Sequence, residues 1–283
     1  MNSRKILTLA CPDRPGISMK VTAFIHGLGG NVVESQQFNA SDTNMFFMRT
    51  IFDLNREQAV DTLRQHFSKI ADEMEMDWEI HHASHKKKVL LFVSKFDHCL
   101  GDLLYRWKIG ELNMDVVGIV SNHPKSALNL SFRDDISYHH LPITKETKPQ
   151  QEAQIKALID ETGAELIVLA RYMQILSDDL SGFLEGRCIN IHHSFLPGFK
   201  GARPYHQAFD HGVKMIGATA HFVTRDLDEG PIIMQDTQAI SHADTPEELV
   251  GKGRDVERRV LSRAVSLFLE DRVFLNGTKT VVF

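Results

Sequence analysis

The sequence predicts an α/β protein of two domains. At 283 residues the chain is about twice as long as a common domain, so each half can bury a core of its own. Short β-branched and aliphatic runs alternate along it with patterns of helical period. The rhythm of this alternation changes near residue 85, where a polar stretch at 81–88 interrupts it. We therefore expect one domain at 1–85 and a second at 86–283.

The first domain is predicted to have the order βαββαβ. A strand runs into the breaker Asp13-Arg14-Pro15-Gly16, which precedes a helical pattern, and a polar turn at 39–44 joins two extended runs into a hairpin. This order is typical of a ferredoxin-like domain. The expected elements are strands at 5–10, 32–38, 45–52 and 75–81 and helices at 17–28 and 56–67.

The second domain alternates strands with helices, as Rossmann-like domains with a mostly parallel sheet do. Its predicted strands are short and continuously apolar, which is typical of strands buried on both faces. Helices are therefore expected on both sides of this sheet. The expected elements are strands at 89–93, 116–121, 166–169, 188–191 and 216–223, helices at 151–162 and 246–269, and a final hairpin around Asn276-Gly277.

Composition excludes several classes of protein. The net charge of −5 offers no general attraction for nucleic acid or anionic lipid. The cysteines Cys11, Cys99 and Cys188 are scattered without a C-x-x-C pair, so neither a disulfide framework nor a thiolate zinc site is expected. No apolar run reaches the roughly 18 residues of a membrane span. We expect a soluble, cytoplasmic protein that binds neither nucleic acid nor membrane.

Polar side chains gather where one predicted strand of the second domain ends. Open α/β sheets bind their ligands at the carboxyl edge of the strands. Asn190 and His192 are two residues apart, so on a strand both point to one face and can donate to one oxygen. The next strand carries His221 and runs into the acidic segment Arg225-Asp226-Leu227-Asp228-Glu229-Gly230, which is expected to bring an imidazole and a carboxylate to the same edge. An amide, imidazoles and a carboxylate together can carry out acyl chemistry.

These motifs resemble the formyltetrahydrofolate-dependent formyltransferases and deformylases. The resemblance rests on Asn190-x-His192, on His221 with Asp228 seven residues later, and on the segment Ser194-Phe195-Leu196-Pro197-x-Phe199-x-Gly201. The motifs Asp13-Arg14-Pro15-Gly16-Ile17 and Gly29-Gly30-Asn31 resemble those of an ACT domain, an amino-acid-sensing module. An ACT unit fused to such a catalytic domain is similar to the deformylase branch of this family, and the resemblance covers nearly the whole chain.

The resemblance implies hydrolysis of 10-formyltetrahydrofolate to formate and tetrahydrofolate, which supplies formate for purine synthesis and balances the one-carbon folate pools. Asn190 and His192 would stabilise the oxyanion as water attacks the formyl carbon, and Asp228 would act as base and proton relay, positioned by His221. The folate is the substrate, and neither a prosthetic group nor a metal is expected. A loop after the strand at 166–169 resembles the family's folate-binding loop, and its candidate contacts are Arg171, Tyr172, Met173, Ile175 and Leu176.

The ACT resemblance implies allosteric control by a small amino acid. Glycine and methionine are the candidate effectors, because both are products of one-carbon metabolism. The effector would bind at the turns of that domain, usually at a subunit interface, and the chain is expected to form a homodimer or homotetramer. The candidate effector residues are Asp13, Gly16, Ile17 and Asn31.

Two other functions stay open on the sequence. A formyltransferase would pass the formyl group to an amine such as glycinamide ribonucleotide, and a sensor without catalysis would only bind folate. A phosphorylated acceptor needs a glycine-rich turn after the first strand of the domain, but here that turn carries Phe96 and Asp97. Transfer to methionyl-tRNA would need a further RNA-binding module and a basic surface. Asn190, His192 and Asp228 are all present, which disfavours an inactive sensor.

A metal at His193 is not expected, although this residue adjoins His192. Neighbouring residues of a strand face opposite ways, and no Glu or Cys stands at zinc-ligand spacing.

Overall fold

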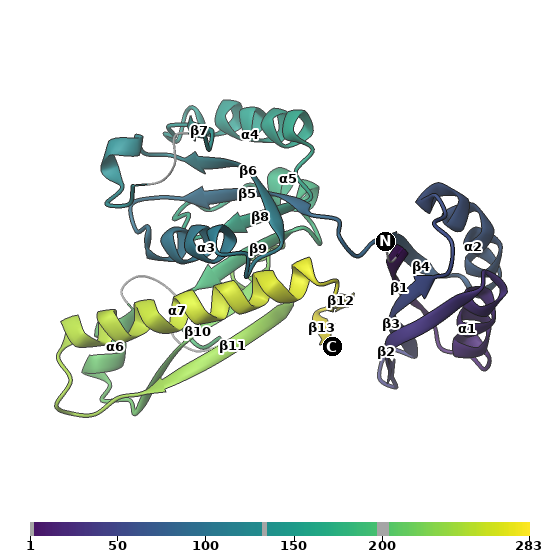
Figure 1. The fold of residues 1–283 in the computed structure, drawn as a ribbon. Helices are drawn as coiled ribbons and strands as arrows, with labels where there is room; N and C mark the ends of the chain where they lie inside the picture. The colour runs from purple at the N-terminus through teal and green to yellow at the C-terminus, as the bar shows by residue number, and fades with distance from the viewer. Residues whose placement is uncertain (1–2, 132–134, 197–203) are drawn as a thin grey trace. The chain divides into compact units, whose positions relative to one another are not determined.

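The computed structural model describes residues 3–131, 135–196 and 204–283, and the chain folds into two compact units (Figure 1). The first unit runs from the start of the described chain to His85 and adds two C-terminal segments, Asp271–Asn276 and Thr280–Phe283. The second unit comprises Lys86–Glu270 with Gly277–Lys279. Each unit has a sheet and a hydrophobic core of its own.

The first unit is an antiparallel sheet with two helices. Its strands lie in the order β2-β3-β1-β4, and every neighbouring pair is antiparallel, which is the arrangement of a ferredoxin-like domain. The predicted βαββαβ order is confirmed. The elements are β1 (Ser3–Pro12), α1 (Ile17–Gly27), β2 (Gly30–Ala40), β3 (Met45–Leu54), α2 (Val60–Met74) and β4 (Asp77–His82).

Helix α2 lies further along the chain than the predicted span 56–67. The buried stripe of the helix continues past Phe67 with Ala71 and Met74, so packing against the sheet extends the helical conformation to Met74. Glu75, with a φ of 56°, ends the helix in the left-handed conformation. The predicted start was also too early, because the chain becomes helical only at Val60.

The second unit is built on a sheet in the order β11-β10-β9-β8-β5-β6-β7. The pairs from β9 through to β7 are parallel, whereas β10 is antiparallel to both of its neighbours. The sheet is therefore mixed and mostly parallel, as predicted. Its strands are β5 (Lys87–Val93), β6 (Met114–Ser121), β7 (Tyr138–His140), β8 (Leu166–Leu169), β9 (Cys188–His192), β10 (Met215–Phe222) and β11 (Ile232–Ala239).

Helices cover both faces of this sheet. Two of them, α4 and α5, share a core with Leu90 and Phe92 of β5. On the other face α3 and α7 lie side by side, and α7 runs along β9, β10 and β11 (Figure 1). The sequence did not predict β7, β11, α3, α5 or α6. Of these, β7, α5 and α6 are short, and half of the residues of β11 are polar. The helices are α3 (His98–Lys108), α4 (Lys148–Thr162), α5 (Asp178–Phe183), α6 (Pro204–Asp210) and α7 (Pro246–Leu269).

The C-terminal hairpin corrects the expectation that residues 271–283 belong with the second domain. Strands β12 (Val273–Asn276) and β13 (Lys279–Val282) follow α7, and most of their residues belong to the first unit. The ring of Phe274 packs edge-on against Phe47, with 5.8 Å between the ring centroids, and Asp271 Oδ2 lies 2.9 Å from His81 Nε2. Both contacts are distant in sequence, so spacing alone could not predict them.

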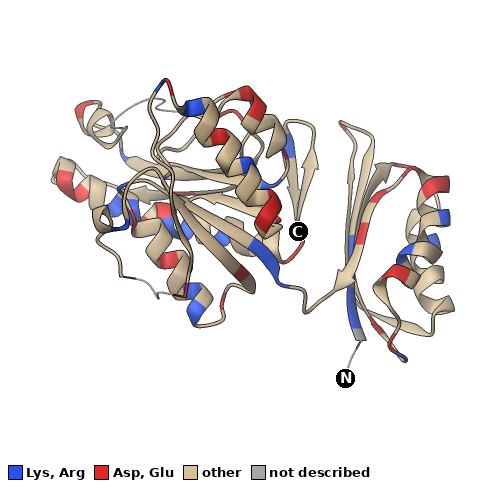
Figure 2. Cartoon of the chain, turned by 90° about the horizontal axis from the view of Figure 1, so that it is seen from above, with Lys and Arg blue, Asp and Glu red and all other residues tan. Residues whose placement is uncertain are grey.

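Acidic and basic residues are interspersed along the helices of both units (Figure 2). A representative pair is Asp102 with Arg106 on α3, whose carboxylate and guanidinium lie 2.8 Å apart one turn along the helix. Within the described ranges, no helix is both long enough and apolar enough to cross a membrane.

Candidate functional site

Strand pairing brings the predicted polar residues together in the second unit. Asn190 and His192 lie on β9, two residues apart on one face, as expected. In the register of β9 and β10, His221 lies directly opposite Asn190, and Asn190 Nδ2 is 3.3 Å from His221 Nε2. Because β10 is antiparallel to β9, the end of β10 does not lie at the shared carboxyl edge, contrary to the sequence prediction. Asp228 instead reaches the site through the loop after β10.

The carboxylate of Asp228 contacts both histidines. His192 Nδ1 is 3.2 Å from Asp228 Oδ2, and His221 Nε2 is 3.7 Å from Asp228 Oδ1. Both imidazole side chains are buried. His221 Nδ1 lies 2.8 Å from the carbonyl oxygen of Phe222, to which it can only donate, so its Nε2 faces Asn190 and Asp228. All four residues that the sequence singled out for catalysis are thus in one cluster.

The environment of Asp228 keeps its carboxylate ionised. Burial alone would raise the pKa of Asp228, but the hydrogen bonds and the electrostatic interactions of its carboxylate with His192 and His221 outweigh this effect. The pKa of Asp228 is therefore held well below its usual range. The residue also has a φ of 57°, a left-handed conformation that the loop imposes on it.

The segment after β9 is anchored by side chains of β10 and β11. Thr219 Oγ1 donates to the Ser194 carbonyl oxygen at 2.9 Å and accepts from the Leu196 amide at 3.0 Å. Gln235 Nε2 donates to the Leu196 carbonyl oxygen at 3.0 Å. These bonds hold the first part of the predicted motif beside the catalytic cluster, whereas its remaining residues, Pro197, Phe199 and Gly201, lie outside the described residues.

Asn190, His192, His221 and Asp228 line a cavity of about 610 Å³ at the carboxyl edge of the sheet. All the predicted folate contacts also border this cavity. Met173 and Ile175 are 49% and 63% exposed, so they offer apolar surface at its opening. Tyr172 is different, because its ring packs edge-on against Phe92 in the core and its hydroxyl accepts from Gln151 Nε2 at 2.7 Å.

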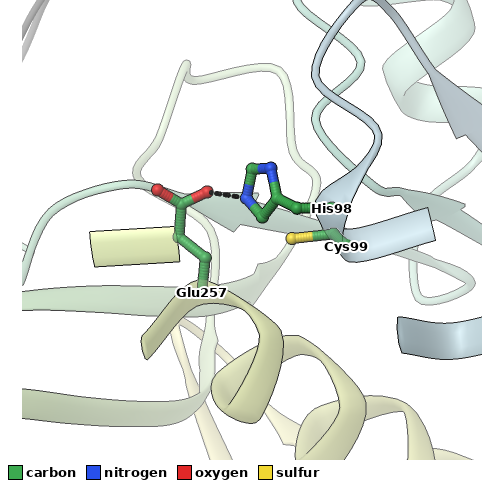
Figure 3. A group of neighbouring side chains, drawn as sticks. All are labelled: His98, Cys99 and Glu257. Carbon is green, nitrogen blue, oxygen red and sulfur yellow. Dashed lines mark hydrogen bonds and ion pairs between the residues drawn. The ribbon is translucent and has the colours of Figure 1, made fainter. Parts of the chain in front are cut away.

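A second polar cluster in the same cavity was not predicted from the sequence. Glu257 on α7 is 1% exposed, and one of its carboxylate oxygens accepts from His98 Nε2 at 2.8 Å (Figure 3). The other oxygen accepts from the Tyr205 hydroxyl at 2.6 Å. Arg171 Nε lies 3.5 Å from the same carboxylate. The sequence signal for this cluster is that Glu257 stands on the mostly apolar buried stripe of α7.

The charge of Glu257 is stabilised where it is buried. Burial alone would raise the pKa of Glu257, but the hydrogen bond from His98, the charge of Arg171 and the Tyr205 hydroxyl together lower it below its usual value. A buried carboxylate with these partners is an ionised one. The cluster is therefore a charged network inside the cavity.

One group of described residues, His98, Cys99 and Glu257, has the ligand types and spacing of a metal site, with its ligand atoms within 4.8 Å of one another (Figure 3). Both oxygens of Glu257 are already engaged, and the cation of Arg171 lies beside them. Burial raises the pKa of the Cys99 thiol well above its usual range, which keeps it neutral. These contacts describe a hydrogen-bonded cluster rather than an open coordination site.

The position of His193 corrects the expectation that it faces away from His192. Strand β9 ends at His192, and the ring centroids of the two histidines lie 5.1 Å apart. Both rings line the cavity. Burial, together with the charges of Arg171 and His192, lowers the pKa of His193 to about 4, so its imidazole is neutral at neutral pH.

The four candidate effector residues lie in the first unit, at the two ends of α1. Gly16, with a φ of 94°, precedes the helix, and Ile17, its first residue, is 2% exposed and part of the core. The Asp13 amide donates to the Asn44 carbonyl oxygen at 2.9 Å. Asn31 is exposed on β2, beyond the other end of the helix.

Comparisons with known proteins agree with this geometry. Residues 87–265 match the family model described as formyl transferase. A formyltetrahydrofolate deformylase of Corynebacterium sp. (strain P-1) is 49% identical over 280 residues, which are 99% of this chain and 98% of that protein. The corresponding protein of Bacillus subtilis (strain 168) is 43% identical over 279 residues, 98% of this chain and 93% of its own.

Solved structures show the same similarity. A crystal structure of formyltetrahydrofolate deformylase from Burkholderia mallei superposes with a TM-score of 0.95 at 52% identity, and the match covers 99% of both chains. Glycinamide ribonucleotide transformylase 1 from Symbiobacterium toebii superposes with a TM-score of 0.63 at 27% identity, over 70% of this chain and 95% of that one.

Proposed function

Because this chain belongs to the formyltetrahydrofolate deformylase family, we propose that Asn190, His192 and Asp228 hydrolyse 10-formyltetrahydrofolate to formate and tetrahydrofolate. The family's enzymes are hydrolases, and the folate is their substrate. The single observation that carries the assignment of residues is the contact of one carboxylate with two imidazoles, beside an amide on the same face of the sheet.

The oxyanion that forms when water attacks the formyl carbon needs prepositioned donors. Asn190 supplies an amide N–H. His192 supplies its Nε2, which is buried and has no hydrogen-bond partner among the described residues, while its Nδ1 faces Asp228. As an imidazolium, His192 donates from both nitrogens, to Asp228 and to the formyl oxygen. A buried donor without a partner is unfavourable in the free protein, and the substrate oxygen would satisfy it.

Proton movement follows from the position of Asp228. The new C–O bond forms from water while the C–N10 bond breaks, so N10 must gain one proton and water must lose one. The ionised Asp228 accepts a hydrogen bond from the attacking water. Its low pKa makes it a weak base, so we propose a concerted relay in which the water proton passes on to N10 and no protonated Asp228 accumulates. The second water proton is lost when formic acid ionises.

The folate contacts belong to this proposal as well. A flat pterin ring needs an apolar slot with backbone groups at its edge. Met173 and Ile175 offer exposed apolar surface at the cavity opening, and Leu176 borders the same cavity. Tyr172 supports the loop from the core, and the role of Arg171 is taken up in the next subsection.

Water is favoured as the acceptor over a phosphorylated amine. Asp97, in the turn after β5, accepts from the backbone amides of Asn129 and Leu130 at 2.6 and 2.9 Å. A carboxylate therefore already occupies amides that an anion such as phosphate could use. In addition, the whole-length similarity is to deformylases, whereas the similarity to a transformylase covers part of the chain.

A turnover assay tests the proposal. Purified protein is incubated with 10-formyltetrahydrofolate and no acceptor, and formate is measured together with tetrahydrofolate. We expect equal amounts of both products. Formyl transfer to glycinamide ribonucleotide with no formate in its absence would identify a transferase instead, and folate binding without any turnover would identify a sensor.

For the first unit we propose an amino-acid effector, glycine or methionine, bound between two copies of the chain. The candidate turns at 13–17 and 29–31 lie at opposite ends of α1, which spans 11 residues and is therefore about 16 Å long. One small amino acid cannot touch both turns of a single chain, but the turns of two chains can meet around it. This supports a homodimer or homotetramer.

Two measurements test the effector proposal. Glycine and methionine are titrated separately into the turnover assay, with alanine as a control, and the oligomeric state is measured by light scattering. We expect one of them to change the rate. An unchanged rate with every amino acid would leave the first unit a structural module, and a monomer at assay concentration would contradict the shared site.

A further inference from the structure

The cavity contains a charged network that the hydrolytic mechanism does not use. Glu257 is held by His98 and Tyr205 and faces Arg171, and all these residues line the cavity that contains the catalytic cluster. The network is continuous with that cluster, because the His193 ring lies 5.1 Å from His192 on one side and 6.3 Å from Tyr205 on the other. It thus forms the wall next to the reacting centre.

The backbone conformation of Arg171 and the burial of its guanidinium are both unfavourable for an arginine. Its φ of 67° is a left-handed conformation in which glycine is favoured over an arginine. Its guanidinium is buried, and Nε and Nη1 have no hydrogen-bond partner among the described residues, although Phe96 stacks 5.7 Å from its centre. A buried cation whose N–H groups lack hydrogen-bond acceptors does not stabilise the fold. The position of Arg171 therefore points to a role in the site.

On the other side of Glu257, the packing of Tyr205 depends on a glycine of α7. Tyr205 lies against α7 at Gly253, where a Cβ atom would come within 2.1 Å of the Tyr205 ring. The missing side chain lets the tyrosine reach Glu257, one turn further along the helix. The wall is therefore packed by side chains from three separate parts of the unit, all meeting at one carboxylate.

We propose that Arg171 occupies the place beside Glu257 that an amine acceptor would take, so that this network excludes amines and leaves water as the nucleophile. A buried carboxylate adjoining the reacting centre is a natural partner for a small cationic amine, and the guanidinium already neutralises it. Arg171, with His98 and Tyr205 behind Glu257, would then determine the specificity of the reaction rather than its rate. The inference rests on the proposed hydrolysis and goes beyond it.

The alternative reaction that the network prevents is balanced in the same way as hydrolysis. An amine bound as a cation would first lose one proton to water, because only the neutral amine has a lone pair. The amine nitrogen would then form a bond to the formyl carbon, the C–N10 bond would break, and one proton would move from the amine to N10. The products would be an N-formyl amine and tetrahydrofolate, so product identity distinguishes the two acceptors directly.

The experiment measures this partition in Arg171→Gly, a change that also suits the left-handed backbone. Each protein turns over 10-formyltetrahydrofolate in the presence of glycinamide, a small primary amine, and formate and N-formylglycinamide are quantified by mass spectrometry. We expect formate to be the main product of the wild type, and Arg171→Gly to raise the ratio of N-formylglycinamide to formate by about tenfold or more above the wild-type ratio.

Two matched variants separate this role from a general one. Arg171→Lys keeps a cation beside Glu257 and should keep the ratio low. Ile175→Ala enlarges the exposed opening of the cavity without touching the network, and should also leave the ratio as in the wild type. A merely structural role of Arg171 would change rate or stability but not the ratio of the two products.

The outcomes are distinguishable. An Arg171→Gly protein that hydrolyses the folate with an unchanged product ratio overturns the inference. If this variant does not turn over, calorimetric titration with glycinamide decides: binding to the variant and not to the wild type supports the inference, and no binding overturns it. A wild type that releases no formate would overturn the proposed hydrolysis itself.

Discussion

Two residues of the catalytic cavity adopt backbone conformations that favour glycine. Asp228 and Arg171 have φ values of 57° and 67°, and each such conformation costs a non-glycine residue about 1 kcal/mol or more. Both side chains carry charge into the cavity, Asp228 toward the imidazoles of His192 and His221 and Arg171 toward Glu257. Two of the five non-glycine residues with positive φ in the described part of the chain thus carry charged side chains into this cavity.

Asp228→Asn tests the proton relay. Asparagine tolerates the left-handed conformation well, so the loop should keep its shape, but the negative charge that faces His192 and His221 is lost. We expect turnover to fall by about 10²- to 10⁴-fold, with folate affinity largely unchanged. Formate release and folate binding by fluorescence quenching measure the two effects. The matched control is Asp226→Asn in the same loop, where the side chain is exposed; near wild-type turnover in Asp228→Asn would exclude the relay.

His193 makes stability depend on pH. Its pKa is about 4 in the folded protein and about 6.5 in an unfolded chain, so between these values the unfolded state binds more protons. The stability contribution is complete above pH 6.5 and is lost as pH falls toward 4. Between pH 7 and pH 5 the wild type should lose about 2 kcal/mol more than His193→Gln. Urea unfolding of both proteins at the two pH values measures this difference, and equal losses would place His193 in a solvated environment.

At the level of the element, α7 has a capped N-terminus, and its middle carries two residues that contact Tyr205. Thr245 and Glu248 form a capping box at its beginning. Further along, its buried stripe of aliphatic residues is interrupted by Gly253 and Glu257, which receive Tyr205. One helix therefore covers three strands and also presents the charged wall of the cavity.

The two glycines of α7 should respond in opposite ways to alanine. At Gly253 the new Cβ would collide with the Tyr205 ring, so Gly253→Ala should destabilise the second unit by about 1–3 kcal/mol. At Gly251 no atom lies within 4 Å of the Cβ position, and Gly251→Ala should stabilise the helix by up to about 1 kcal/mol. Urea midpoints of the two variants provide the comparison, and a stabilised Gly253→Ala would show that Tyr205 is readily displaced.

At the level of the whole molecule, most of the C-terminal residues after the second unit belong to the first unit. The hairpin of β12 and β13 follows directly on α7 and contributes Phe274 and Phe283, whose rings pack against each other at 5.3 Å. Phe274 also contacts Phe47 of β3. The first unit therefore includes residues from both ends of the sequence, and its stability depends on the C-terminus.

Phe274→Ala should weaken the first unit. The side chain is half-buried, so the expected loss is about 1–2 kcal/mol. Amide hydrogen exchange of β1 and β3 reports on this unit alone, and protection there should fall. Leu275→Ala, at a neighbouring position with an exposed side chain, is the control and should change protection little. Equal effects of the two variants would mean that the hairpin is not packed by Phe274.

Much of this architecture could be predicted from local patterns. Helix α7 was predicted at its observed bounds, and the order βαββαβ and the parallel strands followed from hydrophobic period and turn residues, because these signals act over a few neighbouring residues. The pair Asn190 and His192 was predictable for the same reason, since two residues on one strand share a face. His221 and a nearby carboxylate were also expected at this edge from the strand pattern, whereas the choice of Asp228 among the acidic residues came from resemblance to a family.

Contacts between distant segments had to come from the three-dimensional structure. The antiparallel register of β10 places His221 opposite Asn190, and a loop then carries Asp228 back to His192. Glu257 meets His98 across 159 residues of sequence, and neither position has a local motif. Periodicity describes which face of an element is buried but not which other element covers it. The shared face of Asn190 and His192 on β9 could therefore be predicted from the sequence alone, whereas the charged network beside them arises only from packing.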